Sequence, residues 1–429
     1  MTIEQPAFGK RVREIRRAQG LSQGDLAGDD LSPSYVSLVE NGRRVPGARI
    51  ARSLAERLGT TVEALCAGDQ PAGGPSGGLA QRLALVGQLV AARASRQAGD
   101  WAGARQQLEA VLARADADGQ EEIRWEARWE LAAVLGRLGD PARHEAALRG
   151  LLDDPLTRSA PVLHARVAIE LAQLLRGAGR LADAVRAAED AVRAAAELEP
   201  GRPERAQAQV ALVSASVDSG EWDRAGELAA RLRTELAPLP PGELRAGALW
   251  AEAGARYLAG DAGGALELLA EADGLSAATD GVRLRLRLAR ARTLLALAAG
   301  PAAGADALLE RSRQAAALVD TPSARSWLAV LETAGALGRG DTAAAADHSA
   351  AIDPDAPELS PLDRARALLH RARALRAAGR AAAAEESFQA AAAGYEAAGA
   401  FRLALETWRE LSAGARGTGE PDPHAVVMP

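Results

Sequence analysis

The stretch that decides the fold of the N-terminal region is LSQGDLAGDDLSPSYVSLVENGRR, residues 21–44. Two short helices fit it, joined by a tight connection over residues 28–31. Ser22 and Ser32 are each placed to cap a helix, because a serine hydroxyl accepts a hydrogen bond from a free backbone N–H of the first turn. Pro33 then takes the first helical position, where its missing N–H costs nothing. The stretch therefore predicts a helix followed by a turn and a second helix.

The second helix of this stretch has two faces. Val36 and Val39 supply the apolar side, and the helix stops near Gly42, since glycine accepts the left-handed conformation. A capped helix with small outward side chains and arginines after its end suits the major groove of DNA. The residues that we predict to contact DNA are Gln23, Ser32, Pro33, Ser34, Ser37, Leu38, Asn41, Arg43 and Arg44.

Residues 8–67 resemble the repressor-type helix-turn-helix domain of the xenobiotic-response-element family, the fold of phage repressors. Residues 21–27, 34–40 and 41–46 carry the resemblance, although the connection between the two helices is a residue shorter than in phage repressors. The resemblance implies a small five-helix domain, with further helices at about 8–19, 47–58 and 61–67. It also implies an internal pair between Arg16 and Glu40.

The resemblance divides the predicted DNA contacts into two groups. It implies that the DNA backbone is contacted by Gln23, Asn41, Arg43 and Arg44. Short outward side chains remain for the base edges, namely Ser32, Ser34, Ser37 and Leu38, and Leu38 is able to meet a thymine methyl group. Because each of these base contacts is weak, we expect two copies of this N-terminal domain, the head, to bind together as a homodimer on an inverted repeat of double-stranded DNA.

The composition favours a helical protein of several domains. A chain of 429 residues predicts two to four domains. Hydrophobic residues make up 48% but aromatic residues only 3%, so small aliphatic side chains carry the packing, which favours close-packed helices. Cys66 is the single cysteine, and no secretory signal or long uncharged apolar run occurs in the sequence. We therefore expect a cytoplasmic protein without an intramolecular disulfide or membrane segment.

The charge is distributed unevenly. The formal net charge is −6, yet residues 1–67 hold ten Lys and Arg against eight Asp and Glu, which leaves the rest of the chain acidic. Only the N-terminal region is therefore suited to a phosphate backbone.

The segment GDQPAGGPSGG, residues 68–78, is rich in Gly and Pro and has no apolar periodicity. It predicts a flexible linker between two domains. We expect the DNA-binding domain over 1–67, the linker over 68–78, a repeat domain over 79–413 and a disordered tail over 414–429.

The repeat domain is predicted from glycines that recur every 39 to 41 residues. They are Gly99, Gly139, Gly179, Gly220, Gly260, Gly300, Gly340 and Gly379. Each follows a helical stretch, and alanine stands five residues later except in the second repeat, which has His144. Small side chains allow two antiparallel helices to approach closely, so the pattern resembles the tetratricopeptide repeat. It predicts an all-α superhelix of about eight helix pairs, with a capping helix to about Leu411.

Chemistry typical of enzymes is missing from the sequence. The single lysine, Lys10, lies in no glycine-rich phosphate loop, and the five histidines are scattered without cysteine partners. A lone cysteine without ordered partners is weak evidence for a nucleophile. We predict no catalytic residue, no metal site and no cofactor.

The concave side of the superhelix is the second candidate site. In tetratricopeptide superhelices the first helix of each pair faces inward, which exposes the positions about ten and thirteen residues before each glycine. The residues predicted there are Trp129, Gln207, Trp250, Arg287, Arg290, Trp327 and Arg366, with Tyr257 one turn nearer its glycine. Aromatic and arginine side chains together suit a peptide or an anionic small molecule. The alternative is that the tryptophans fill gaps between alanine-rich helices and that the arginines of 282–292 form a solvated stripe.

The combination of a DNA-reading head and a repeat array resembles regulators of Gram-positive bacteria whose repeats sense a ligand, including the peptide-pheromone sensors and similar proteins of actinobacteria. This implies a transcriptional regulator whose array dimerises and binds a peptide or small-molecule effector. The alternative is an interaction scaffold, in which the repeats hold a protein partner and the head tethers it to DNA.

Overall fold

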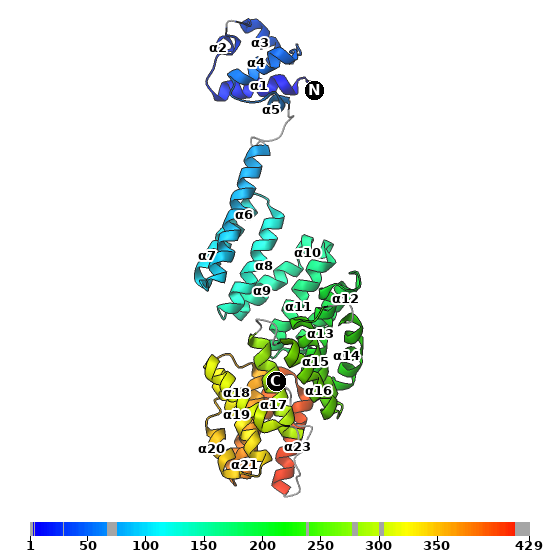
Figure 1. The fold of residues 1–429 in the computed structure, drawn as a ribbon. Coiled ribbons are helices and arrows are strands. Elements are labelled where there is room, and N and C mark those ends of the chain that lie inside the picture. The colour runs from blue at the N-terminus through cyan, green and yellow to red at the C-terminus, as the bar shows by residue number, and fades with distance from the viewer. Residues whose placement is uncertain are drawn as a thin grey trace. The chain divides into compact units, whose positions relative to one another are not determined.

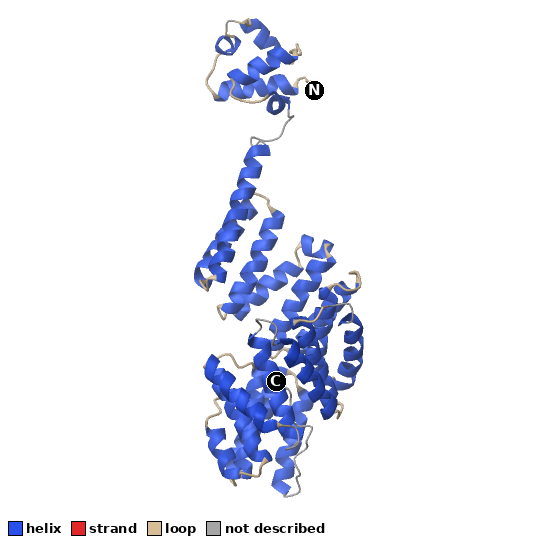
Figure 2. Ribbon diagram, in the orientation of Figure 1, coloured by secondary structure: helices blue, strands red, loops and turns tan. Residues whose placement is uncertain are grey.

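In the computed structural model, the residues described are 3, 5–28, 30–66, 75–236, 240–276, 282–299 and 304–416. Every regular element in these residues is a helix (Figures 1 and 2), which confirms the predicted all-α class. By contacts the chain divides into two compact units, residues 1–98 with 110–123 and residues 99–109 with 124–429.

The N-terminal domain contains five short helices. They are α1 (Ala7–Ala18), α2 (Gln23–Ala27), α3 (Pro33–Glu40), α4 (Ala48–Arg57) and α5 (Val62–Cys66). One apolar side chain or more from each helix meets in a single core, in which Phe8, Val12, Leu26, Leu54 and Leu65 are each 0% exposed. The five-helix arrangement is the predicted one.

The regular elements in the rest of the described chain are also helices. They are α6 (Pro75–Gln97), α7 (Trp101–Ala117), α8 (Glu121–Arg137), α9 (Pro141–Leu152), α10 (Pro155–Ser159), α11 (Pro161–Gly177), α12 (Leu181–Ala196), α13 (Pro203–Ser219), α14 (Trp222–Leu236), α15 (Glu243–Leu258), α16 (Ala262–Ser276), α17 (Val282–Ala299), α18 (Ala305–Val319), α19 (Pro322–Gly338), α20 (Thr342–Ala350), α21 (Pro361–Ala377), α22 (Ala381–Ala398) and α23 (Phe401–Arg416).

Three predicted boundaries need correction. Helix α6 begins at Pro75, so the last four residues of the predicted 68–78 linker are helical. Helix α23 continues to Arg416, past the predicted end near Leu411 and into the predicted tail. At the start of α6, Pro75 takes the first helical position, where its missing N–H costs nothing. At the end of α23, the helix formers Ala413, Ala415 and Arg416 continue the helix past the predicted end. Residues 68–74 of the linker and 417–429 of the tail lie outside the described residues.

The repeat glycines make the turns inside the helix pairs. Gly99, Gly139, Gly179, Gly220, Gly260, Gly340 and Gly379 have φ between 72° and 89°, which explains why glycine recurs there, whereas Gly300 lies outside the described residues. The alanine five residues later is buried in every repeat that has one. In the second repeat His144 replaces it, and its ring lies against Gly136, where an added Cβ would come within 2.9 Å of the imidazole. Glycine in the facing helix therefore makes room for the larger side chain.

The last helices of the array pack against its middle. Leu181 and Trp222, which begin α12 and α14, share one apolar cluster with Leu362, Phe388 and Leu403 of α21, α22 and α23. The guanidinium of Arg402 lies 3.6 Å from the Trp222 ring centroid. The approach is so close that a Cβ on Gly220 would lie 2.8 Å from the Cβ of Arg402. The superhelix from α11 to α23 therefore closes on itself.

Candidate functional site

The helix-turn-helix is held by two serine caps. The Ser22 hydroxyl accepts a hydrogen bond from the Asp25 N–H at 3.1 Å, and the Asp25 carboxylate accepts one from the Ser22 N–H at 2.8 Å. At the start of α3 the Ser32 hydroxyl accepts from the Tyr35 N–H at 3.1 Å, with Pro33 in the first helical position. Both caps are those predicted from the sequence, and they fix where α2 and α3 begin.

Helix α3 has a buried face and an open face. Val36 and Val39 are 0% exposed in the domain core, whereas Leu38 is 39% exposed and Ser34 is exposed. Ser37 is half-buried between the two faces. The open face of α3 thus carries the side chains predicted to meet base edges.

Glu40 links α1, α2 and α3 through its carboxylate. The guanidinium of Arg16 donates to it twice, from Nε to Oε1 at 2.6 Å and from Nη2 to Oε2 at 3.0 Å. The Gln23 amide donates to Oε2 at 2.8 Å. Arg16 and Glu40 are only 8% and 4% exposed, so the predicted pair is present and buried. Gln23 therefore has one amide N–H committed inside the domain.

The arginines after α3 lie in an exposed turn. The Gln5 amide donates to the Arg44 carbonyl at 2.9 Å and to the Val39 carbonyl at 3.2 Å, which ties this turn to the chain before α1. Arg43 and Arg44 are exposed, and the Arg44 guanidinium lies 5.5 Å from the Tyr35 ring centroid. The geometry leaves two cations beside the open face of α3, and contact of each predicted residue with DNA stays a prediction.

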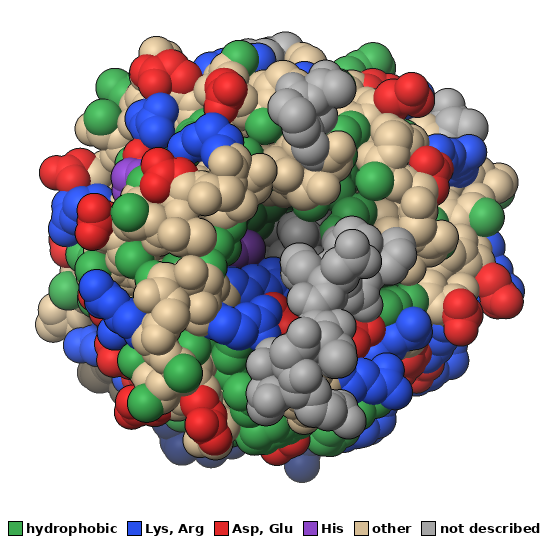
Figure 3. Space-filling view, turned by 90° about the horizontal axis from the view of Figure 1, so that it is seen from below, with side chains coloured by type: hydrophobic (Ala, Val, Ile, Leu, Met, Phe, Trp, Pro, Cys, Tyr) green, Lys and Arg blue, Asp and Glu red, His purple; other side chains and the backbone are tan. Residues whose placement is uncertain are grey.

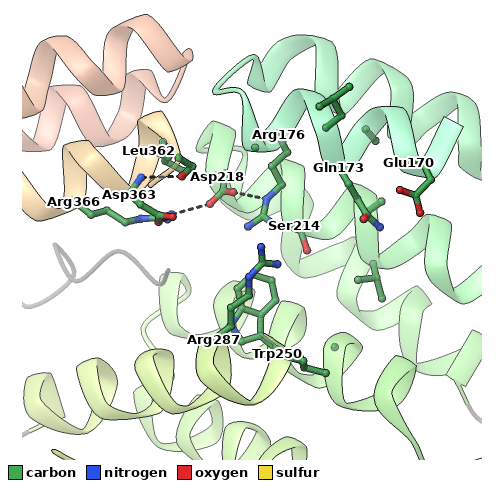
Figure 4. A pocket seen from close by; sticks show the side chains of 18 of the residues that line it. Glu170, Gln173, Arg176, Ser214, Asp218, Trp250, Arg287, Leu362, Asp363 and Arg366 are labelled. Atoms are coloured by element: carbon green, nitrogen blue, oxygen red, sulfur yellow. Dashed lines mark hydrogen bonds and ion pairs between the residues drawn. The ribbon is translucent and has the colours of Figure 1, made fainter. Parts of the chain in front are cut away.

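The repeat region contains a cavity of about 440 Å³. Seen from below in Figure 3, this part of the molecule is hollowed, and basic side chains lie on the wall of the hollow. The lining comes mainly from the first helices of pairs, α11, α13, α15, α17 and α21. Its polar side chains include Glu170, Gln173, Arg176, Ser214, Asp218, Arg287, Asp363 and Arg366, with Trp250 among the apolar ones (Figure 4).

A chain of ion pairs crosses one side of the cavity. Asp218 of α13 accepts from Arg176 of α11 at 2.5 Å and from Arg366 of α21 at 2.9 Å, as the dashed lines of Figure 4 show. Arg366 also donates to Asp363 at 2.8 Å. The Arg176 guanidinium lies 5.4 Å from the Trp250 ring centroid. The cavity wall therefore presents arginines whose positions are fixed by acidic neighbours and by an aromatic ring.

Burial shifts the pKa of two lining groups. Desolvation raises the pKa of Glu170, which favours its neutral form, and desolvation lowers the pKa of His144. Burial acts against the charge of Arg366, yet the carboxylates of Asp218 and Asp363 outweigh it, so the pKa of Arg366 is raised. Near neutral pH the cationic groups of the wall are Arg176, Arg287 and Arg366, and its anionic side chains are mostly engaged by them.

The structure sorts the predicted effector residues into three groups. Trp250, Arg287 and Arg366 line the cavity, and their contact with an effector stays a prediction. Tyr257 and Trp327 are each 3% exposed in apolar clusters, so the groove prediction is wrong for these two because neighbouring helices cover their rings. The other three residues are not among those that line the cavity. The ring of Trp129 stacks on the ring of Trp125, with 5.9 Å between the centroids, and Gln207 is exposed on α13. The guanidinium of Arg290 lies 5.3 Å from the ring centroid of Trp327.

The sequence reasoning missed Arg176, Gln173 and Ser214. They stand three or six residues before their glycines, on the same inward stripe as the predicted positions but one and two turns nearer the helix end. Extending the stripe by those turns identifies them. Asp218 and Asp363 carry no such signal, since their role depends on the closure of the array.

Within the described part of the chain, no helix is long and apolar enough to cross a membrane. The same residues contain no group of three or more His, Cys, Asp or Glu side chains arranged to hold a metal ion.

Residues 7–66 match the family described as "Helix-turn-helix domain". Over 81 residues the chain is 40% identical to the HTH-type transcriptional regulator DdrOP3 of Deinococcus deserti, an alignment that covers 18% of this chain and 63% of the relative. This chain thus spans less than two thirds of the length of the curated relative that it matches.

Two solved structures match this chain at low identity, each with a TM-score below 0.5. One is a Rap protein in complex with competence and sporulation factor, with 11% identity and a TM-score of 0.47 over 97% of this chain and 99% of that one. The other is PlcR of Bacillus thuringiensis in complex with the peptide PapR7 and DNA, with 11% identity and a TM-score of 0.35 over 63% of this chain and 94% of that one. From its own helices and the family match, this chain carries a helix-turn-helix domain at residues 7–66, followed by paired helices of the tetratricopeptide-like type.

Proposed function

We propose that this protein is a sequence-specific DNA-binding transcriptional regulator, whose repeat domain dimerises and binds an effector in the central cavity. The observation that carries the proposal is the open face of α3, flanked by two exposed arginines, on a domain that matches the helix-turn-helix family. The regulator DdrOP3, to which the first part of the chain is similar, supports the transcriptional role.

The division of labour within the head follows from side-chain length and charge. Arg43 and Arg44 are long cations suited to phosphate oxygens, which fix register without reading sequence. Ser34 and Leu38 are short and neutral, so each adds little affinity but distinguishes base edges and thymine methyl groups. A single head therefore distinguishes DNA sequences only weakly, and we propose that two heads bind an inverted repeat.

The cavity is suited to an effector with an acidic group. Its volume of about 440 Å³ lies in the range of small-molecule sites and holds a small molecule or a few residues of a peptide. Three arginines from α11, α17 and α21 reach its wall. In the described residues the buried indole N–H of Trp250, a residue of the cavity wall, has no hydrogen-bond acceptor.

The DNA-binding part is tested by selection from randomised double-stranded DNA with the full-length protein. We expect enrichment of an inverted repeat whose half-sites are about one helical turn apart, roughly 10 base pairs. Enrichment of a single, non-repeated site bound tightly by a monomer contradicts the dimeric reading mode. Absence of any enriched sequence contradicts sequence-specific binding altogether.

The effector part is tested by native mass spectrometry of the protein purified from bacterial cells without denaturation. We expect a bound mass that is retained in Arg285→Ala and lost in Arg287→Ala, because Arg287 lines the cavity and Arg285 is an exposed arginine on the same helix. A bound mass that is equally retained in both variants places the ligand elsewhere.

An unliganded cavity together with a stoichiometric protein partner on the repeat region supports the alternative, a DNA-tethered interaction scaffold. The same purification distinguishes the two functions, because the partner appears as a second polypeptide rather than as a small added mass.

A further inference from the structure

Helix α6, the first helix of the repeat region, exposes large apolar side chains to solvent. Leu79, Leu83, Val86 and Val90 are 58%, 61%, 41% and 56% exposed. The opposite side of the same helix is buried, since Leu85 and Leu89 are 0% and 6% exposed. Helix α6 therefore has two apolar faces, and the described residues cover only one of them.

The spacing of the exposed face identifies the kind of surface that covers it. Successive residues of the exposed face are separated by four, three and four positions. This is the spacing of the a and d positions in a coiled coil, whereas a helix packed in a globular core has a wider apolar stripe. Arg82 is the single charged residue between Leu79 and Val90, and Gly87 and Ala80 beside the seam are small. The seam thus carries little charge to repel an identical seam, and its neighbours permit close approach.

We propose that this α6 seam, defined as Leu79, Leu83, Val86 and Val90, pairs in parallel with the α6 seam of a second copy of the chain. A parallel pair has a two-fold axis along the helices, which is the symmetry of an inverted-repeat site. This proposal rests on the proposed function, because that function requires two DNA-binding domains on one two-fold symmetric DNA site.

The exposed area sets the strength of the pair. The four side chains expose on the order of 400 Å² per copy, the size at which an apolar patch marks an interaction surface. Two copies bury roughly 800 Å² of it, less than the about 1,200 Å² of a stable independent interface. The pair is therefore weak in free solution and strengthens when DNA holds both heads, which makes DNA binding cooperative.

The length of chain between the head and the seam fits this arrangement. Helix α5 ends at Cys66 and α6 begins at Pro75, so eight residues separate them in each copy. Eight residues span at most about 28 Å, and two such segments diverging from a helix pair reach beyond the roughly 34 Å between half-sites one turn apart. Pairing of α6 therefore leaves both heads able to reach neighbouring half-sites.

The test uses full-length protein without DNA, in which Cys66→Ser removes the native thiol. In that background Leu83→Cys places a cysteine in the seam, and Ala84→Cys places one on the exposed surface next to it. Under a mild oxidant at high protein concentration we expect a covalent dimer of Leu83→Cys and at least tenfold less of Ala84→Cys. In an antiparallel pair Leu83 faces a different residue of the partner, so equal cross-linking of the two variants, or none, overturns the proposal.

A second measurement avoids dependence on disulfide chemistry. In sedimentation of the otherwise native chain, Leu83→Glu with Val90→Glu should raise the dimer dissociation constant at least tenfold, with helical circular dichroism unchanged. The matched control is Leu318→Glu, since Leu318 is 88% exposed on α18. A dimer that resists the double substitution overturns the α6 assignment. Failure of the wild-type protein to select DNA contradicts the proposed function instead, and leaves the dimer measurement standing.

Discussion

Glu40 is the residue on which three helices of the head converge. Burial alone raises the pKa of its carboxyl, but hydrogen bonds from Arg16 and Gln23 outweigh burial and hold the pKa below its usual range. The carboxylate thus stays ionised in a nearly closed site, where its absence leaves the Arg16 guanidinium without a counter-charge. The same bond sets the position of Gln23, which stands at the start of α2 where the DNA backbone is expected.

We expect Glu40→Ala to destabilise the head by about 3–5 kcal/mol, because a buried arginine loses its partner. Glu14→Ala is the matched control, since Glu14 forms an exposed pair with Arg11 and should contribute less than about 1 kcal/mol. Hydrogen exchange of peptides from residues 7–66 in the full-length protein measures the loss of stability in both variants. Equal protection of the two variants contradicts a structural role for the pair.

The pH dependence of the head has a defined sign. The folded pKa of Glu40 is depressed, so its contribution to stability is complete above the unfolded pKa, about 4.3, and is lost as the pH falls through the lower folded value. We expect exchange protection of the head to decrease more steeply below pH 4.3 in the wild type than in Glu40→Gln. Parallel pH profiles of the two proteins contradict the assignment.

At the scale of elements, the short helix α3 packs one face into the domain core and leaves the other face open to solvent. Val36 and Val39 anchor it in the core, and the Ser32 cap fixes its start, so the orientation of Ser34 and Leu38 does not depend on DNA. The arginine turn is tied to the chain before α1 by the Gln5 amide. A pre-formed reading face of this kind lowers the entropy lost on binding.

Two substitutions on this element should separate phosphate contact from base reading. Arg43→Ala should weaken binding to every sequence alike and reduce the salt dependence by about one phosphate contact. Ser34→Ala should keep the salt slope and relax the preference at one base pair of each half-site. Titrations with the selected DNA and with scrambled DNA at several salt concentrations measure both. An Arg43→Ala protein that loses specificity but keeps its salt slope reverses the two assignments.

At the scale of the whole repeat region, one buried acidic group lies where the array closes. Asp218 is 3% exposed and holds Arg176 from α11 and Arg366 from α21, which is 148 residues away in the sequence. The apolar cluster of Leu181, Trp222 and the last helices lies beside it. Closure and the cavity wall therefore share the same side chains.

We expect Asp218→Ala to destabilise the repeat region by about 3–5 kcal/mol and to increase its radius of gyration, because Arg366 stays buried with only Asp363 to compensate it. Asp223→Ala, at an exposed position of α14, is the control and should change neither. Urea unfolding followed by circular dichroism, with small-angle scattering of the folded protein, provides the measurements. An Asp218→Ala protein as stable and compact as the control shows that the apolar cluster alone closes the array.

The sequence by itself determined the features that act over a few residues. The caps at Ser22 and Ser32, the alternation of faces along α3 and the left-handed glycines of the repeats each depend on local backbone geometry, and each stands where it was predicted. The pair of Arg16 and Glu40 came from family resemblance, since nothing local joins residues 24 positions apart.

Only the tertiary structure decided which inward positions line the cavity. Arg287 and Trp327 both stand thirteen residues before their repeat glycines, yet Arg287 reaches the cavity and Trp327 is covered by neighbouring helices. The register within a helix fixes the direction in which a side chain points, but the curvature of the superhelix and the helix opposite decide what it meets. Asp218 shows the same limit, because its partner Arg366 arrives from the far end of the array through packing that no local pattern encodes.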